Sequence, residues 1–394
     1  MNLLITLEHH FDRTPDGVVW TQTTFPHSFW RHYLKVFDHV GVLARVREVE
    51  SVPSDYQQAN GDRVSFIALP DYIGPKQYLL KVRQVEQTVK NAFTLGNAVI
   101  MRVSSQIANH LQPLLDKHNY PYGVEVVADP YDVFAPNSVR HPLRPFFRWR
   151  FPQQLRRQCA GACAATYVTK HALQARYFCP NYSVGISDVE LSEECFVLTP
   201  RRFTKLDTLH LLFVGTLAQL YKAPDVLINA VAICVQQGID LKLTIVGDGK
   251  HRTELEAQAV GLGLKDSVFF RGQLAAGDTV RAELDQADVF VLPSHQEGLP
   301  RAMVEAMARG LPCIGSTVGG IPELLAAEDM VQPGDANGLA QKIREVVTNP
   351  ERMAKMSARN LQKAKEYKSE VLYEQRIDFY RYVREQTELW LKQQ

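Results

Sequence analysis

The sequence lacks several short motifs that would assign it to a well-defined class of protein. Its six cysteines include no C-x-x-C pair, so neither a zinc site nor a dithiol redox site is indicated. No G-x-x-x-x-G-K-S/T occurs, and no G-x-G-x-x-G follows an expected strand, which argues against a P-loop and against a nicotinamide-dependent dehydrogenase. No D-x-D is present, so we expect no metal bridging a diphosphate and no cofactor.

Long hydrophobic runs are also missing. No stretch reaches the roughly 20 apolar residues of a membrane span, and residues 1–8 lack the basic segment and the apolar length of a signal peptide. A formal net charge of +1 gives no indication of a nucleic acid partner. Cysteines without a pairing pattern are typical of small buried side chains in a reducing compartment. We therefore expect a cytoplasmic protein.

A regular alternation of strands and helices is present from residue 209 onward. The 394 residues suffice for two ordinary domains, and a hydrophobic fraction of 45% is typical of globular chains. Short runs of Val, Ile and Leu alternate with amphipathic segments, which indicates a parallel sheet with helices on both faces. The expected strands are 210–215, 241–247, 267–272, 288–293, 313–316 and 330–331, and the expected helices include 225–236, 252–260 and 336–347.

The first half follows the same pattern less regularly. Its expected strands are 3–7, 41–46, 98–103, 124–128 and 164–168, and its expected helices are 28–37, 76–94 and 105–117. Periodicity lapses between residues 193 and 207, where we expect a linker. The predicted fold class is therefore α/β, with two Rossmann-like domains, 1–195 and 207–368, whose parallel sheets face a central cleft.

The tail, residues 369–394, is typical of a helix with many aromatic positions, so that one of its faces must be buried. Two arrangements are compatible with this pattern. Either the helix crosses back to the first domain, which is the prediction we adopt, or it stays on the second domain.

Glu297 and Glu305 form the most informative pair in the chain. The apolar run 288–293 is typical of a buried strand, and Gly310 and Pro312 end the helix that follows, so Glu297 lies in the loop after a strand and Glu305 in a helix. Ligands of open α/β sheets bind at the carboxyl ends of strands, where helix N–H groups favour an anion. Carboxylates beside an anion site suit hydroxyl groups, and a nucleotide sugar supplies both phosphates and hydroxyls.

Other junctions after expected strands reach the same edge of the sheet. Gly215 lets the backbone approach a ligand, and Lys222, just before a helix, can place a cation on a diphosphate, although a solvated lysine is the alternative. Gly247 is a further small residue beside the nucleotide. The segment containing Arg271, Gln273 and Leu274 can offer backbone groups to a nucleobase.

In order and spacing, residues 209–335 resemble the GT-B glycosyltransferases of family 4. The resemblance rests on Gly215 with Lys222, on Val246-Gly247-Asp248-Gly249, on the block from Pro293 to Ala308, and on Gly319-Gly320-Ile321-Pro322-Glu323. It implies that Glu297 and the following amides of Gly298 and Leu299 hold the donor sugar, that Glu305 holds the ribose, and that Lys222 holds the diphosphate.

The sequence departs from the family pattern at Thr216, where an arginine usually adds a second charge on the phosphates. On the side of the first domain, Gly17 is the candidate for the glycine loop that approaches the diphosphate, and Arg13 is a candidate replacement for the missing charge. No histidine follows the strand at 124–128. Asp129 occupies that neighbourhood, as a catalytic residue or as a turn-forming Asp-Pro.

The resemblance implies a retaining transfer of a sugar from a nucleoside diphosphate sugar, with a uridine diphosphate sugar favoured, to a hydroxyl acceptor in surface polysaccharide or glycoconjugate biosynthesis. Lys222, Glu297 and Asp129 are the predicted catalytic residues. Three alternatives stay open: a guanosine diphosphate sugar as donor, a nucleotide-sugar epimerase, and a non-catalytic nucleotide-sugar-binding protein.

Residues 140–157 are strongly biased in composition. They carry six arginines and no acid, interleaved with Phe and Trp. Such a stretch suits peripheral contact with an anionic membrane at the inner face and a lipid-linked acceptor. The alternative is a positively charged face on a domain without membrane contact.

Overall fold

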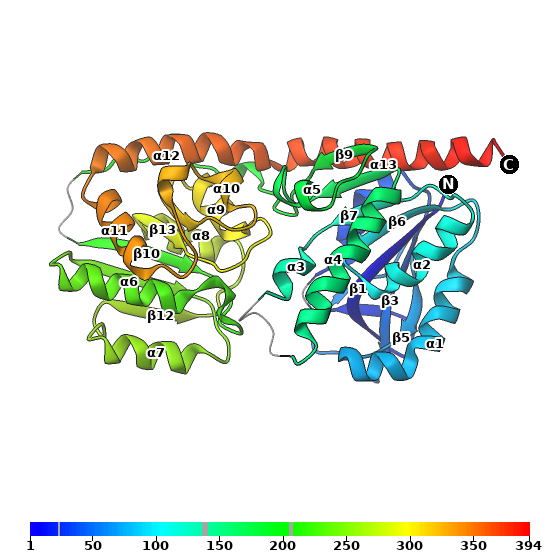
Figure 1. Ribbon diagram of the computed structural model, residues 1–394, viewed down its shortest axis with the longest axis horizontal. Helices are drawn as coiled ribbons and strands as arrows, with labels where there is room; N and C mark the ends of the chain where they lie inside the picture. The colour runs from blue at the N-terminus through cyan, green and yellow to red at the C-terminus, as the bar shows by residue number, and fades with distance from the viewer. Residues whose placement is uncertain (23, 136–140, 205–207) are drawn as a thin grey trace. The chain divides into compact units, whose positions relative to one another are not determined.

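The computed structural model describes residues 1–22, 24–135, 141–204 and 208–394 (Figure 1). It divides into two compact units. The first contains Met1–Tyr131, Phe146–Ile186 and Tyr373–Gln394, and the second contains Asp132–Pro145 and Ser187–Leu372. The division at Ile186 precedes the linker expected at 193–207, whose last residues, 205–207, lie outside the described residues.

The sheet of the first unit is mainly parallel. Its described strands are β1 (Leu3–Arg13), β2 (Val19–Thr21), β3 (Val40–Glu48), β4 (Gln57–Gln58), β5 (Val64–Pro70), β6 (Ala98–Val103), β7 (Gly123–Val126), β8 (Ala164–Tyr167) and β9 (Tyr182–Gly185). They run in the order β5-β3-β1-β6-β7-β8-β9, with all these neighbours parallel. An antiparallel extension, β1-β2-β4, was not expected from the sequence.

Helices cover both faces of this sheet. The described helices and turns are η1 (His27–Arg31), η2 (Tyr33–Lys35), α1 (Gly74–Ala92), α2 (Gln106–Lys117) and α5 (Ala172–Arg176), with α3 (Pro130–Val133), α4 (Arg144–Gly161) and α13 (Ser369–Leu391) crossing the division. Because side chains alternate along a strand, Val124 and Val126 of β7 join the core beside α2 and α4. Glu125 points to the other face, toward η2 and α13.

The helix expected at 28–37 was only partly right, because the structure forms two short 3-10 turns there, η1 and η2. The aromatic side chains of this segment explain the difference, since they pack in several directions instead of along one helical face. Trp30 donates a hydrogen bond to the carbonyl of Ala59, and Tyr33 stacks on Tyr380 with ring centroids 4.4 Å apart.

Residues of α13 from Tyr373 onward belong to the first unit. Tyr380 lies fully buried, and Trp390 packs against Tyr120 with centroids 4.6 Å apart. The side chains of Phe379 and Val383 leave no room for a Cβ at Gly123 of β7, the closest atom being 2.7 Å from where that carbon would stand. The aromatic face expected from the sequence is therefore buried against the sheet of the first unit.

The second unit is a doubly wound parallel sheet. Its described strands are β10 (Leu209–Val214), β11 (Leu241–Val246), β12 (Val268–Gly272), β13 (Val289–Leu292), β14 (Cys313–Ser316) and β15 (Met330–Val331), in the order β12-β11-β10-β13-β14-β15. Its helices and turns are η3 (Glu193–Cys195), η4 (Leu220–Lys222), α6 (Pro224–Gln236), α7 (Arg252–Gly261), α8 (Asp278–Gln286), α9 (Arg301–Ala308), α10 (Ile321–Leu324), η5 (Ala327–Asp329), α11 (Ala336–Val347), α12 (Pro350–Ala364) and η6 (Lys365–Tyr367). The predicted α/β class with parallel sheets is confirmed.

The strands of the second unit are largely apolar, although β10, β11 and β12 carry the exposed or half-buried polar side chains of His210, Lys242 and Arg271. All four residues of β13 and of β14 are buried, and they form one core with α6, α9 and α11. This packing fixes the ends of β10 and β13, from which the loops of the candidate site emerge. In the described part of the chain, no helix combines the length and apolarity needed to cross a bilayer. All six cysteines are free thiols.

Candidate functional site

The loop after β10 places Lys222 close to the end of the strand. Lys222 is the last residue of η4, and Ala223, in a left-handed conformation with φ 55°, turns the chain into α6. A Cβ on Gly215 would lie 2.4 Å from Cδ of Lys222. Gly215 is therefore small because the lysine side chain crosses directly over it. Thr216 accepts a hydrogen bond from the backbone N–H of Ala218 at 3.1 Å and carries no charge to the site.

Gly247 and Gly249 are needed by the packing of two loops against each other. A Cβ on Gly247 would stand 1.9 Å from the carbonyl oxygen of Gly215, and one on Gly249 would stand 2.0 Å from the backbone nitrogen of Ala218. The N–H of Leu217 also donates to the carbonyl of Asp248 at 2.9 Å. The structure therefore explains Gly247, a predicted donor-binding residue, by backbone contact between the loops after β10 and β11.

Glu297 lies in the loop between β13 and α9 and meets Lys222. Its Oε1 atom accepts hydrogen bonds from Nζ of Lys222 at 2.7 Å and from Oγ of Ser294 at 2.8 Å. The Lys222 side chain is only 15% exposed and the Glu297 side chain only 8%. Two predicted site residues that lie 75 positions apart in the sequence thus form one partly buried ion pair.

The loop after β14 holds the Glu297 loop in place. Gly319 has φ 52°, and a Cβ there would stand 1.8 Å from the carbonyl oxygen of Glu297. The N–H of Gly320 donates to the carbonyl of Gly298 at 2.7 Å. Backbone contact therefore fixes Glu297, Gly298 and the half-buried Leu299, which leads into α9 through Pro300.

Glu305 lies one turn into α9 and is partly buried. Burial raises the pKa of its carboxyl above the ordinary value, while the nearby guanidinium groups of Arg301 and Arg281 act in the opposite direction. Glu297 precedes the helix and Glu305 follows its first turn, so the two predicted hydroxyl ligands flank the N-terminus of α9. Helix N–H groups at such a position favour an anion.

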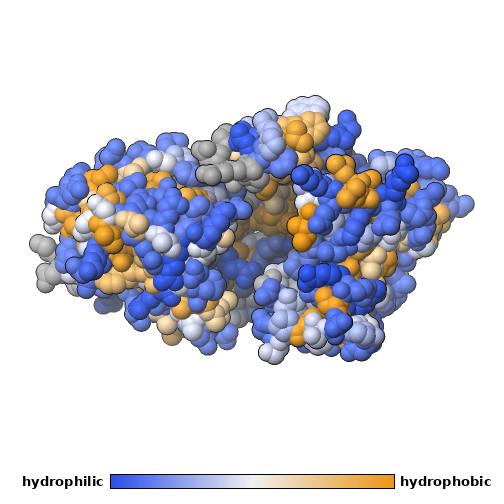
Figure 2. Space-filling view, turned by 90° about the horizontal axis from the view of Figure 1, so that it is seen from below, coloured by the Kyte–Doolittle hydropathy of each residue, from blue (hydrophilic) through white to orange (hydrophobic). Residues whose placement is uncertain are grey.

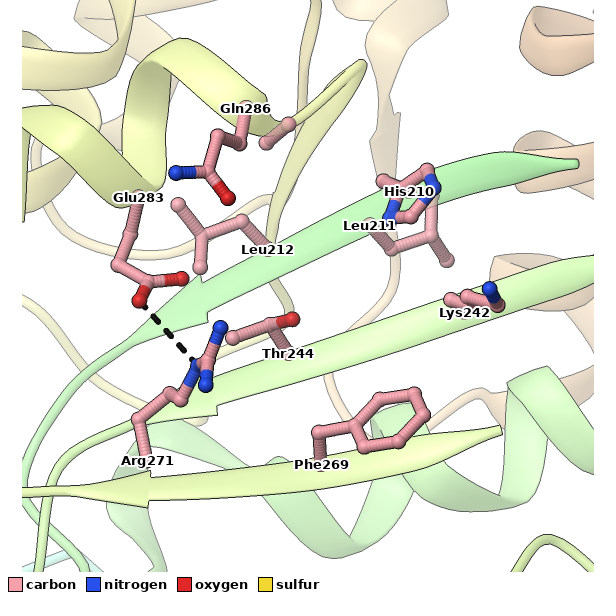
Figure 3. A pocket seen from close by; sticks show the side chains of 10 residues that line it. His210, Leu211, Leu212, Lys242, Thr244, Phe269, Arg271, Glu283 and Gln286 are labelled. Atoms are coloured by element: carbon pink, nitrogen blue, oxygen red, sulfur yellow. Dashed lines mark ion pairs between the residues drawn. The ribbon is translucent and has the colours of Figure 1, made fainter. Parts of the chain in front are cut away.

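Arg271 is held elsewhere on the second unit. Figure 3 shows it pointing toward Glu283 of α8, in a depression of about 340 Å³ on the face of the sheet, with His210 and Lys242 at the other end. The Nε atom of Arg271 is 3.2 Å from Oε1 of Glu283. The Lys222–Glu297 pair instead lies in the loops beyond the carboxyl ends of β10 and β13. Gln273 is exposed and bonds the carbonyl of Leu274 at 3.3 Å.

Gly17 and Asp129 belong to the first unit. Gly17, with φ 81°, forms the turn between β1 and β2, where its N–H donates to the carbonyl of Thr14 at 2.9 Å. This hairpin turn is sufficient reason for a glycine. Arg13, at the end of β1, donates through Nε to Oε1 of Glu48 at 3.0 Å.

The Asp129 carboxylate has several partners. It is buried and bonds the guanidinium of Arg176, the hydroxyl of Tyr177 and, at 2.9 Å, the N–H of Tyr131. These contacts are typical of a turn-forming aspartate that is held by Arg176 of α5 and by Tyr177, the residue that follows this helix. Both interpretations of Asp129 therefore remain predictions, and the turn is the one with contacts in the structure.

Ser294, Gly319 and Arg301 are functional candidates that sequence reasoning did not assign. Ser294 had a weak signal, because a hydroxyl three residues before a glutamate can bond its carboxylate. Gly319 was noted only as part of a glycine turn, since nothing local shows that it faces Glu297. Arg301 lies between the two glutamates in the sequence and is the first residue of α9.

Comparisons with known proteins agree with this geometry. Residues 208–349 match the family described as glycosyl transferases group 1. The chain is 27% identical to protein CapJ of Staphylococcus aureus, over 82% of this chain and 81% of that protein. It is 34% identical to the amylovoran biosynthesis glycosyltransferase AmsK of Erwinia amylovora, over only 41% of each chain.

Solved structures show the same fold over nearly the whole chain. Sucrose-phosphate synthase from Thermosynechococcus elongatus has a TM-score of 0.67 at 16% identity, covering 97% of this chain and 98% of its own. HepE of Anabaena in complex with UDP has a TM-score of 0.64 at 16% identity, covering 95% and 98%. The resemblance predicted from the sequence is thereby confirmed: residues 208–349 match the glycosyl transferases group 1, and the fold of nearly the whole chain is that of these solved structures.

Proposed function

We propose that this protein is a retaining glycosyltransferase that moves a sugar from a nucleoside diphosphate sugar to a hydroxyl acceptor during assembly of a surface polysaccharide or glycoconjugate. The observation that carries the proposal is the pairing of Lys222 with Glu297 at 2.7 Å beside the start of α9. AmsK, which is named for amylovoran biosynthesis, supports the polysaccharide assignment. A related structure holding UDP supports a uridine nucleotide, with a guanosine nucleotide as the alternative.

The ion pair defines what the donor must replace. When a nucleotide sugar binds, Lys222 turns from the carboxylate of Glu297 to the diphosphate, and Glu297 accepts hydroxyl hydrogens of the sugar. Positive charge fixed at the leaving diphosphate stabilises the transition state without any proton transfer by the protein. The acceptor hydroxyl attacks on the face from which the diphosphate leaves, and a phosphate oxygen receives its proton.

The two glutamates are not a nucleophile and acid pair. A retaining glycosidase needs carboxyl groups about 5–5.5 Å apart on either side of one bond. Here Glu297 is engaged by Lys222 and Ser294, whereas Glu305 lies eight residues on, in α9. We therefore assign both to substrate hydroxyls, with Glu297 on the sugar and Glu305 on the ribose.

A thermal-shift panel of nucleotides and nucleotide sugars tests the donor class, because a ligand that binds only the native form raises the melting temperature. We expect the largest shift with UDP or a UDP-sugar.

Turnover followed by NMR should give a product with the donor's anomeric configuration. An inverted product would contradict the retaining mechanism, an epimerised donor would indicate the epimerase, and binding without turnover on any acceptor would indicate the non-catalytic alternative. Activity that survives EDTA is the expected result for a metal-independent site.

We further propose that α4 brings the protein to the inner face of an anionic membrane, where a lipid-linked acceptor would lie. Phe146 and Trp149 are 51% and 57% exposed, with ring centroids 6.0 Å apart. Among the described residues, Arg150 and Arg157 have no acidic partner, whereas Arg148 lies over the ring of Tyr131. Arg140, the first of the six arginines, lies outside the described residues. Figure 2 shows apolar patches within a mainly hydrophilic surface.

Co-sedimentation with vesicles tests this contact. Binding should be strong to vesicles rich in phosphatidylglycerol, weak to phosphatidylcholine, and reduced by added salt. Replacing Phe146 and Trp149 by Ser should weaken it severalfold while the thermal shift with UDP is unchanged. Equal binding of wild type and variant would leave α4 as a charged face without membrane contact.

A further inference from the structure

The proposed donor site has too little positive charge for a diphosphate, because the charge of its lysine is already matched by a glutamate. This inference rests on the proposed function, since it concerns the same donor. Lys222 is matched by Glu297 at 2.7 Å, and Thr216 adds no charge. A nucleoside diphosphate leaving group carries at least two negative charges, and cations aimed at that charge are usually the largest catalytic contribution. A second cation is therefore needed near the start of α9.

Arg301 occupies the position that this charge requires. It is the first residue of α9, four residues after Glu297 and four before Glu305. In a nucleoside diphosphate sugar the diphosphate lies between the sugar and the ribose, which are the groups assigned to these two glutamates. We propose that Arg301 binds the donor diphosphate and supplies the charge that Thr216 does not.

The contacts of Arg301 leave its guanidinium available. The side chain is exposed, and it donates from Nη2 to the carbonyl of Asp188 at 3.4 Å, near the outer limit of a hydrogen bond. Within the described residues it has no acidic partner. Neighbouring arginines are committed elsewhere, since Arg281 bonds Asp278 and Arg309 bonds Asp285 through Nε at 2.7 Å.

Its charge also reaches the partner assigned to the ribose. Arg301 and Glu305 are separated by four residues on one helix, a spacing that brings side chains together. The guanidinium groups of Arg301 and Arg281 both lower the pKa of the Glu305 carboxyl, and that of Arg301 has the larger effect. An arginine can contact two phosphate oxygens at once through its planar fork, which a lysine cannot do.

Isothermal titration of the full chain with UDP and with uridine tests the assignment, with GDP and guanosine in parallel. Arg301→Ala should weaken binding of the diphosphate by about tenfold or more and leave nucleoside affinity unchanged. The diphosphate affinity of Arg301→Lys should lie between that of wild type and that of Arg301→Ala. Adding Thr216→Arg to Arg301→Ala should restore diphosphate affinity, because a positive charge then returns to the site from the loop after β10.

The control is Arg344→Ala on α11, an exposed arginine bonded to Gln237, which should bind like wild type. Unchanged diphosphate affinity in Arg301→Ala would overturn the inference, as would equal losses for diphosphate and nucleoside, which indicate a structural defect. A wild-type protein that binds no nucleotide would instead overturn the proposed function. The two failures are therefore distinguishable.

Discussion

The ion pair of Lys222 and Glu297 sets the charge state of the candidate site before a ligand arrives. Both side chains are largely shielded from solvent, so removing one partner leaves the other buried without a counter-charge. Ser294 reduces this cost for Glu297 through its hydroxyl, 2.8 Å away. Changes at these residues therefore affect both the chemistry and the local stability, and experiments must separate the two.

Lys222→Ala should lower kcat/KM by about 100-fold or more, because one preorganised charge at the leaving group is lost. Steady-state kinetics with the best donor of the panel measures the effect. The matched control is Lys242→Ala, on the face of the sheet beside His210, which should retain wild-type kinetics (Figure 3). Similar kinetics for wild type and Lys222→Ala would exclude the lysine from the mechanism.

Glu305→Gln should separate binding from stability. The pKa of Glu305 is raised in the folded state, so the folded protein favours the protonated form more than the unfolded chain does. Its contribution to stability is full below the unfolded pKa and is lost as pH rises through the folded pKa. At pH 7 the glutamine variant should therefore melt at a higher temperature than wild type and bind UDP more weakly.

The melting-temperature difference should shrink as pH falls below about 4, the region of the unfolded carboxyl pKa. A variant less stable than wild type at pH 7, or a difference that does not change with pH, would contradict the assigned burial effect.

At the scale of elements, glycines fix the distance between neighbouring loops. Gly319→Ala would place a methyl carbon 1.8 Å from the carbonyl oxygen of Glu297, at a backbone φ of 52° that side chains rarely adopt. We expect a loss of stability of about 2 kcal/mol or more, together with weaker binding of donor sugar. Urea unfolding measures the first effect and titration with a UDP-sugar the second. Gly261→Ala, at the end of α7 where a Cβ meets no atom within 4 Å, is the control.

Most elements of the second unit could be predicted because they have a strong local signal, although the helix α12 was not expected. The run 288–293 contains β13, and the helix expected at 225–236 begins one residue early at Pro224. In the first unit, β5 was missed, since exposed and half-buried residues break its apolar run. The 18-residue α4 was not predicted as a helix, because arginines and two prolines hide its periodicity, and only its biased composition was noted.

The candidate site could be predicted where loops follow strands, but the contacts inside it could not. Lys222 and Glu297 were singled out separately, and only the fold shows that they touch. Arg271 lies at the expected strand end, yet alternation along β12 directs it to the sheet face and Glu283. Two of the partners of Asp129, Arg176 and Tyr177, are 47 and 48 residues away, beyond the reach of any local pattern.

At the scale of the whole molecule, the last helix completes the first unit. Glu125 is buried and bonds the hydroxyl of Tyr33 at 2.8 Å, Nη1 of Arg102 at 2.8 Å and the hydroxyl of Tyr380 at 3.3 Å. A buried carboxylate is stable only with such a set of partners. Residues separated by 255 positions therefore share one polar cluster in the core of the first unit.

Gly123→Ala tests how tightly α13 is held. The added Cβ would stand 2.7 Å from Cγ2 of Val383 and 3.0 Å from Cζ of Phe379, so that helix and sheet must separate. Overpacking of this kind should cost about 1–3 kcal/mol in the free energy of unfolding. Adding Val383→Ala should recover part of that loss. If the changes in the free energy of unfolding caused by Gly123→Ala and Val383→Ala are additive, the two side chains do not clash and the packing of α13 on β7 is less tight than these distances indicate.

The non-contiguous composition of the first unit has a consequence for its synthesis on the ribosome. At about 5–20 residues per second, roughly 10–40 s separate translation of Ile186 from that of Tyr373. During that interval the surface that will receive Tyr380 and Val383 is open to water, and Glu125 lacks one of its partners. The unit encoded first is thus finished last, and the nascent chain presents an uncovered sheet that chaperones can recognise while the second unit is already folding.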